Sequence, residues 1–248
     1  MKKTVLISGG SRGIGRATAV LMAQKGWQVA FTYRVGGAAA KETQAAIEEG
    51  GGNALALQGD TAREEDVLAV FEGAVKSFGR LDAVVVNAGV VAPSMPLSEM
   101  SIDRLKTMFD TNILGSFLFA REAARYLPPQ IAGKEAAIVL VSSAAARLGS
   151  PNEYVDYAAS KGALDTLTLG LAKELVSQRI RVNGVRPGLI ETGIHASGGQ
   201  PDRAGRLGKN VPMARPGTAE EVAQAIAWLC SEEASYCTGS ILDVAGGR

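Results

Sequence analysis

Short apolar segments alternate with longer amphipathic segments along almost the whole chain. The apolar segments are rich in β-branched residues and lie at 4–8, 29–33, 54–58, 83–87, 137–142, 181–185 and 240–244. Between them, apolar residues recur at helical spacing, at 14–26, 38–49, 62–78, 101–127, 157–178 and 218–231. This alternation predicts a parallel sheet, and strands without a polar side predict helices on both of its faces. We therefore expect an α/β fold with a doubly wound, seven-stranded parallel sheet, in a single domain that covers 1–248.

The starts of two helices are marked more sharply than the others. Thr61 with Glu64, and Thr218 with Glu221, fit the capping box, in which a hydroxyl and a carboxylate each bind a backbone amide of the first turn. The long stretch 193–213 differs, because it is rich in glycine and polar residues and follows a strand directly. Loops of this length are usually functional, so we expect a mobile substrate lid with few apolar anchors. A flexible surface segment without a function is the alternative.

The composition favours small-molecule chemistry. Hydrophobic residues make up 46% of the chain, and 26 Lys and Arg nearly balance 25 Asp and Glu. Because no basic block is present to neutralise phosphates, we expect no binding to nucleic acid or to a membrane surface. Glycines interrupt the first apolar run too early for a signal peptide, which predicts a cytoplasmic protein. In that setting Cys230 and Cys237 are expected to be reduced thiols, and we expect no metal site.

The turn after the first apolar segment, GGSRG at 9–13, fits two different motifs. Ser11 stands where a hydrolase of the Gly-x-Ser-x-Gly type has its nucleophile. That class needs an oriented histidine, and the only histidine is His195, in the flexible stretch. Gly9, Gly13 and Gly15 instead allow a cofactor's phosphates to approach the backbone at a helix N-terminus. We expect the dinucleotide-binding turn, with a tight turn that binds no ligand as the alternative.

A second group of residues suggests proton transfer. Tyr157 and Lys161 are four residues apart at the start of a helix and so lie on one face, and Ser143 ends the preceding strand. A free tyrosine has a pKa about three units too high for proton transfer at neutral pH, a gap of roughly 4 kcal/mol that an adjacent ammonium can largely supply. Taken alone, the spacing also fits an ordinary helix with a solvated lysine.

These motifs occur together and in a fixed order. They are Gly9-x-x-x-Gly13-x-Gly15, Asn87-Ala88-Gly89, Asn112, Ser143, Tyr157-x-x-x-Lys161, and Pro187-Gly188 with Thr192. In this order and over essentially the whole chain, the sequence resembles the classical short-chain dehydrogenase/reductase family, with 3-oxoacyl-carrier-protein-reductase-like and sugar-dehydrogenase-like members nearest. Ser8 and Val86 depart from the usual pattern without removing a reacting group, and Ser142 beside Ser143 is a second candidate hydroxyl.

The resemblance implies a Rossmann-type fold and a role for each matched residue. Tyr157 would be the general acid or base, Ser143 would hold the substrate oxygen, and Lys161 would lower the tyrosine pKa and bind the nicotinamide ribose. Asn112 would orient a water that links the lysine to solvent, with a purely structural asparagine as the alternative. The implied cofactor-binding residues are Gly9, Ser11, Arg12, Gly13, Ile14, Gly15, Arg34, Asp60, Asn87, Ala88, Gly89, Tyr157, Lys161, Pro187, Gly188 and Thr192.

The end of the second strand indicates which nicotinamide cofactor is used. NAD-selective folds carry an acidic residue there, but this chain reads FTYRVGG, with Arg34 directly after the strand and Arg12 in the glycine turn. Both resemble the basic pair that meets the 2′-phosphate of NADP. We expect reduction of a small-molecule carbonyl, or the reverse reaction, with NADP(H) preferred and NAD(H) as a second cofactor. A catalytically silent nucleotide-sensing or scaffold protein is the alternative. The resemblance also implies a homotetramer that joins through the helices beginning near 101 and 157.

Overall fold

Seven parallel strands form one sheet in the computed structural model, which describes residues 2–127 and 135–248. The strands are β1 (Thr4–Ile7), β2 (Gln28–Tyr33), β3 (Asn53–Gln58), β4 (Ala83–Val86), β5 (Ala136–Val141), β6 (Ile180–Pro187) and β7 (Ile241–Val244). Their order across the sheet is β3-β2-β1-β4-β5-β6-β7, and every pairing is parallel. The predicted doubly wound parallel sheet is confirmed.

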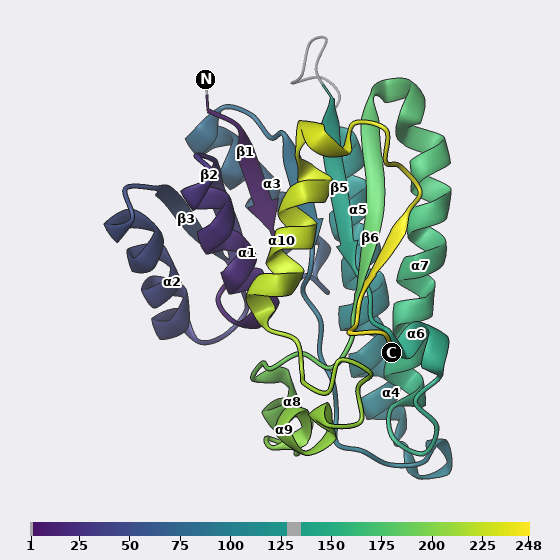
Figure 1. The fold of residues 1–248 in the computed structure, drawn as a ribbon. Helices are drawn as coiled ribbons and strands as arrows, with labels where there is room; N and C mark the ends of the chain where they lie inside the picture. Colours follow the sequence, from purple (N-terminus) through teal and green to yellow (C-terminus); the bar gives the residue numbers. More distant parts are fainter. Residues whose placement is uncertain (1, 128–134) are drawn as a thin grey trace.

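Helices cover both faces of this sheet, as Figure 1 shows. One face carries α1 (Gly13–Gln24), α2 (Gly37–Glu49) and α10 (Ala219–Cys230), and the other carries α3 (Glu64–Phe78), α5 (Gly115–Tyr126) and α7 (Val155–Leu175). Successive strand residues point to opposite faces, so Val5 and Ile7 join the first hydrophobic cluster and Leu6 joins the second. This two-sided burial explains the continuous apolar pattern of the strands.

The strand order reverses direction between β1 and β4. From β1 the chain adds β2 and β3 on one side, and from β4 it adds β5, β6 and β7 on the other. Open α/β sheets bind ligands at such a switch point, beyond the carboxyl ends of the strands. The short helices α6 (Ala145–Leu148), α8 (Ile194–Ser197) and α9 (Arg203–Gly208) lie at this end of the sheet (Figure 1).

Two predicted helix features differ in the structure. The helix expected over 101–127 is divided into α4 (Ile102–Phe109), a π-helical turn (Asp110–Leu114) and α5. The capping box expected at Thr61 is wrong, because α3 begins only at Glu64 and Arg63 precedes it without a side-chain cap. Asp60 accepts from the Ala62 amide instead, and Thr61 packs against Gly115.

The other elements agree more closely with the expected pattern. The capping box of Thr218 and Glu221 is present at the start of α10. Short 3-10 turns lie at Leu97–Glu99, Val176–Gln178 and Glu232–Ala234. Within residues 2–127 and 135–248, no helix has the length and apolar character that crossing a bilayer requires.

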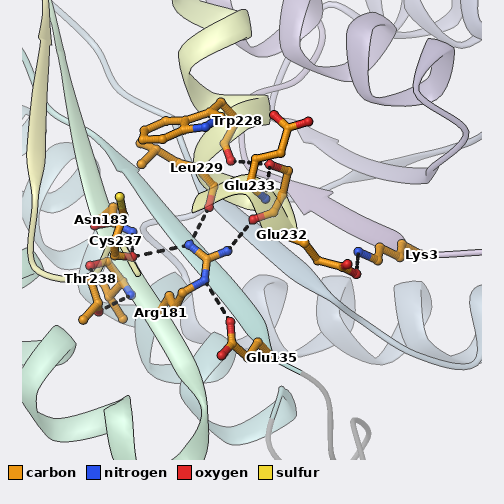
Figure 2. Close-up of polar contacts among 12 residues, drawn as sticks. Lys3, Glu135, Arg181, Asn183, Trp228, Leu229, Glu232, Glu233, Cys237 and Thr238 are labelled. Atoms are coloured by element: carbon orange, nitrogen blue, oxygen red, sulfur yellow. Dashed lines mark hydrogen bonds and ion pairs between the residues drawn. The ribbon is translucent and has the colours of Figure 1, made fainter. Parts of the chain in front are cut away.

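A buried arginine holds the amino-terminal edge of the sheet together (Figure 2). Arg181, near the start of β6, is 7% exposed and donates to the carbonyls of Leu229 and Ser231 at 2.9 Å each and to that of Cys237 at 3.4 Å. Its Nε lies 3.4 Å from Glu135 Oε2. Carbonyls at the end of a helix lack hydrogen-bond donors within the helix. At the end of α10 the guanidinium provides these donors.

Candidate active site

The glycine turn between β1 and α1 is closed by the chain that follows β4. Asn87 Nδ2 donates to the carbonyls of Ser8 and Gly9, at 2.9 and 3.0 Å. Ser8 Oγ accepts from the amides of Asn87 and Ala88, both at 2.9 Å. Ser8 therefore supplies the hydroxyl that joins the two segments across the switch point.

Two glycines of this turn have no room for a side chain. A Cβ on Gly15 would lie 2.2 Å from the Gly9 carbonyl oxygen, and one on Gly10 would lie 2.5 Å from Phe31 Cβ. Gly9 and Gly13 have φ values of 67° and 54°, which L-residues rarely adopt. Helix α1 begins at Gly13 with neither a side-chain cap nor an acidic residue in its first turn. Its first amides are thus free to bind an anion, so the turn fits the diphosphate of a dinucleotide.

One cleft at the carboxyl edge of the sheet gathers almost all the predicted site residues. Asn112 is the exception, because it is fully buried and lies outside the cleft lining. The predicted residues that line the cleft are Gly9, Ser11, Arg12, Gly13, Ile14, Gly15, Arg34, Asp60, Asn87, Ala88, Gly89, Ser143, Tyr157, Lys161, Pro187, Gly188 and Thr192.

Tyr157 and Ser143 meet where β5 and α7 approach each other. Burial raises the pKa of Tyr157, and its hydrogen bond with Ser143 offsets part of that rise. Tyr157 therefore stays protonated at neutral pH in this structure, as a proton donor must. Ser142 Oγ, in contrast, donates to the Lys161 carbonyl at 3.0 Å and is almost fully buried. The hydroxyl that bonds the tyrosine is that of Ser143.

Lys161 is buried one turn further along α7. Its Nζ donates to the Val141 carbonyl at 2.8 Å and lies 5.7 Å from the centroid of the Tyr157 ring. Burial lowers the pKa of Lys161 to about 8, although Asp165 acts in the opposite direction. The ammonium faces the ring in this arrangement, and the predicted lowering of the tyrosine pKa by Lys161 stays a prediction.

Similarity to known proteins agrees with this geometry. The family model described as enoyl-(acyl carrier protein) reductase matches residues 9–248. An uncharacterized oxidoreductase of Escherichia coli K12, YgfF, is 51% identical over 98% of both chains. The 3beta-hydroxysteroid dehydrogenase 1 of Eggerthella lenta is 39% identical, over 99% of this chain and 93% of that protein. The chain belongs to the classical short-chain dehydrogenase/reductase family.

A solved structure of the same family has nearly the same fold. The 3-ketoacyl-(acyl-carrier-protein) reductase of Brucella melitensis, complexed with NADH, superposes with a TM-score of 0.92 and 32% sequence identity over 99% of this chain and 98% of that chain. The protein described here is accordingly an oxidoreductase. Its glycine turn occupies the first βα turn of a Rossmann-type sheet, and the hydrolase alternative has no support. His195 Nε2 lies 2.8 Å from the Ile190 carbonyl oxygen, so the imidazole has a partner other than Ser11.

Asn112 connects three parts of this dehydrogenase/reductase from behind the cleft. Its amide donates to the Val90 carbonyl at 3.0 Å and to Ser160 Oγ at 3.1 Å, and it accepts from the Val90 amide at 2.8 Å. Ser160 Oγ in turn donates to the Tyr157 carbonyl at 2.7 Å. Asn112 occupies the π-helical turn, where one extra residue per turn changes the direction of the side chains, and such turns often mark functional sites.

An ion pair that the sequence did not indicate supports the start of α7. Arg104 Nε and Nη2 donate to the two carboxylate oxygens of Asp156, at 2.8 and 3.1 Å. Arg104 also donates to the Pro93 carbonyl. Asp156 precedes Tyr157 directly, so this pair fixes the first turn of α7 against α4 and the loop after β4. The two residues are 52 positions apart, and no spacing signal connects them.

The segment 193–213 contains the short helices α8 and α9. Ala204 and Val211 bury their side chains against Leu189, with Leu207 packed beside them. The mobile substrate lid stays a prediction. Burial lowers the pKa of His195, whose ring lines the cleft, so this residue adds no positive charge at neutral pH.

Proposed function

We propose that this enzyme interconverts a small-molecule carbonyl and the corresponding secondary alcohol with a nicotinamide cofactor. The observation that carries the proposal is the single cleft shared by the glycine turn and by Ser143, Tyr157 and Lys161. A dinucleotide at the switch point and a proton donor beside it are what hydride transfer to a carbonyl needs.

Each side chain has a defined part in the reduction. Ser143 Oγ orients the carbonyl oxygen toward Tyr157, and Tyr157 Oη donates its proton to that oxygen. When bound, NADPH or NADH supplies the hydride. Lys161 would use its remaining ammonium donors on the nicotinamide ribose. The proton lost by the tyrosine would be replaced along a water path that Asn112 helps to order. In alcohol oxidation Tyr157 accepts the proton instead.

The cofactor residues divide between the two halves of the dinucleotide. The turn at Gly9, Gly13 and Gly15 would hold the diphosphate, with Ser11 and Ile14 beside it. Asp60 would contact the adenine. Asn87, Ala88 and Gly89 would close the cofactor site after β4, and Pro187, Gly188 and Thr192 would line it after β6, with Thr192 beside the carboxamide.

NADP(H) is the proposed preferred cofactor, with NAD(H) as the second. Arg34 and Arg12 are both exposed, and both line the adenosine end of the cleft. Arg34 Nη1 lies 3.6 Å from Asp60 Oδ2, an ion pair at the edge of the site. An exposed pair of this kind is weak, so a 2′-phosphate can recruit the guanidinium at little cost.

A panel of aldehydes, ketones and diketones tests the activity. Purified enzyme should oxidise NADPH with at least one of them, followed by the loss of reduced-nicotinamide absorbance. Lack of turnover across the whole panel, despite measurable NADPH binding, would favour the catalytically silent alternative.

The enzyme is further proposed to be a homotetramer. Ile102 on α4, Phe117 on α5 and Leu169 on α7 are 63%, 45% and 47% exposed, and α7 contacts both α4 and α5. Exposed apolar side chains on adjoining helices favour an interface between copies. Light scattering at micromolar concentration should give four times the mass of the chain, and a monomeric mass would contradict the proposal.

A further inference from the structure

The loop directly before the catalytic helix is held in an uncommon backbone conformation. Between α6 and α7, Gly149, Ser150 and Asn152 all have positive φ, at 73°, 45° and 60°. Side chains other than glycine rarely adopt this region, and where they do, the surrounding contacts must hold them there. The loop ends at Tyr154, three residues before Tyr157. The Ser150 carbonyl accepts from the amides of Glu153 and Tyr154, at 3.3 and 3.1 Å, and the Glu153 carbonyl accepts from the Met95 amide at 3.1 Å, so contacts of residues 153 and 154 help to hold the loop.

The side-chain contacts of Glu153 and Tyr154 come from the lid segment. Arg203 of α9 makes a bidentate pair with Glu153, with Nη1 to Oε1 at 2.9 Å and Nη2 to Oε2 at 2.6 Å. Gln200 Nε2 donates to Tyr154 Oη at 2.7 Å. The guanidinium of Arg203 also lies 5.0 Å from the centroid of the Tyr154 ring. Bidentate pairs and cation–π contacts both fix orientation, so the lid and the loop form one continuous wall.

This wall belongs to the substrate half of the cleft. Tyr154 and Arg203 line the same cleft as Ser143 and Tyr157, and Leu148 and Val91 line it with them. Tyr154 is only 7% exposed, and its ring is therefore packed and not free to rotate. None of these four wall residues, Tyr154, Arg203, Leu148 and Val91, belongs to the cofactor set.

The lid also affects the charge of the wall, through the ion pair of Arg203 with Glu153. The hydrogen bond from Arg203 lowers the pKa of Glu153, so the carboxylate remains ionised and paired at neutral pH. Arg203 consequently offers no free positive charge to an anionic substrate. At Tyr154 the wall presents an aromatic ring beside this ion pair. Arg206 and Arg248 also lower the pKa of Glu153, and Arg248 lines the cleft.

We propose that Tyr154 determines the size of the carbonyl compound that this enzyme accepts, because Gln200 and Arg203 of the lid fix its ring as a wall of the substrate pocket. Gln200, Arg203 and Glu153 are then positioning residues, and Tyr154 is the specificity-determining one. The inference rests on the proposed carbonyl reduction.

Substitutions at Tyr154 test the wall directly. With NADPH, kcat/KM is measured for a compact diketone, butane-2,3-dione, and for a bulky one, 1-phenylpropane-1,2-dione, within the carbonyl panel. Tyr154→Ala should raise the ratio of bulky to compact kcat/KM by about tenfold or more, as expected for a pocket enlarged by a side chain. Tyr154→Phe keeps the ring and loses only its hydrogen bond with Gln200, so it should move the ratio by roughly threefold or less, far below the effect of the alanine variant. Tyr154→Leu, which retains apolar packing without the ring, repeats the test where the alanine variant is unstable.

Substitutions at the ion pair of Arg203 and Glu153 test whether these residues position the Tyr154 ring. Arg203→Met and Glu153→Gln should move the ratio in the same direction by roughly threefold, mainly through KM, because the ring remains but loses its support. Arg215→Met is the matched control. It removes a bidentate pair with Glu221, at 2.9 and 2.6 Å, that lies outside the cleft lining. This control should leave the ratio unchanged.

Hydrogen exchange without any ligand gives a readout that needs no turnover. Arg203→Met should raise exchange in 193–208 and in 149–154, and unchanged exchange in both segments would overturn the positioning role. Wild-type turnover with an unchanged ratio in Tyr154→Ala and Tyr154→Leu would overturn this inference alone. Failure of the wild type to reduce any member of the panel would overturn the proposed function, and this inference with it.

Discussion

Two buried cations, Arg181 at the amino edge of the sheet and Lys161 at the carboxyl edge, are held in opposite ways. Arg181, at the amino edge, donates to three main-chain carbonyls and pairs with Glu135. Lys161, at the carboxyl edge, is 3% exposed, and within the described part of the chain its ammonium donates one hydrogen bond, to the Val141 carbonyl. Burial lowers the pKa of this lysine to about 8.

The two buried cations therefore serve different purposes: Arg181 stabilises the fold, and Lys161 belongs to the proposed active site. A buried cation is costly unless its donors are satisfied, and an ammonium has three donors. Arg181 satisfies carbonyls that would otherwise be orphaned, so it stabilises the junction of α10 and β6. Lys161 leaves ammonium donors for a ligand. Burying this ammonium therefore costs free energy of folding, and binding of a ligand can relieve that cost. Four predictions separate the two roles.

The largest expected effect concerns Tyr157, beside Lys161. Tyr157→Phe should reduce carbonyl turnover by about three orders of magnitude or more, because only the proton donor is lost. NADPH affinity and the unfolding midpoint should stay close to the wild-type values. Steady-state kinetics and NADPH titration provide the check, and retention of more than about a tenth of wild-type turnover would remove Tyr157 from its role.

At the amino edge of the sheet we expect a loss of stability without a loss of turnover. Arg181→Met should lower the free energy of unfolding by about 3 kcal/mol, because buried carbonyls lose their donor. The folded fraction should keep its turnover. Urea unfolding measures the change, with Glu135→Gln as the control that removes only the exposed partner and should cost less than about 1 kcal/mol. A loss of kcat without a loss of stability would show that Arg181 acts on the site.

The pH dependence of stability sharpens the contrast. Because the pKa of Lys161 falls from 10.5 to about 8 on folding, its charge opposes folding fully below pH 8, and this cost disappears as the pH rises from 8 toward 10.5. Lys161→Met should be inactive but more stable than the wild type at pH 7, by about 2 kcal/mol, and the gap should narrow above about pH 8 and close above about pH 10.5. Lys173→Met removes an exposed lysine of the same helix and should shift stability little at any pH. A Lys161→Met variant that is less stable than the wild type at pH 7 would contradict the account.

The smallest expected effect lies at the adenosine end of the cleft. Arg34→Asp should shift the ratio of kcat/KM for NADPH over NADH toward NADH by roughly tenfold or more, because it replaces a phosphate partner by a ribose acceptor that repels the phosphate. Arg16→Asp places the same charge change on α1, outside the cleft lining, and serves as the control. An unchanged cofactor ratio would make Arg34 an ordinary surface residue.

Much of this protein could be predicted from its sequence. The alternation of strands and helices is a local pattern, so the parallel sheet and its two helical layers followed directly from it. The glycine turn and the Tyr157–Lys161 spacing are also local, and they identified the family and the cleft residues. Thr61 shows the limit of a local pattern, because it matches a capping box in sequence but packs against Gly115 in the fold.

Tertiary structure alone decided how the site is held. The pairs Arg104–Asp156 and Glu153–Arg203 join residues 52 and 50 positions apart, and Arg181 reaches carbonyls about as distant along the chain. The π-helical turn that directs Asn112 toward Val90 also interrupts a stretch whose apolar spacing reads as one helix. A sequence period reports which face of an element is buried, whereas the partners of a buried charge depend on how separate elements pack. For that reason the side chains that we propose to react could be predicted from the sequence, but the contacts that orient Tyr154, Tyr157 and Lys161 could not.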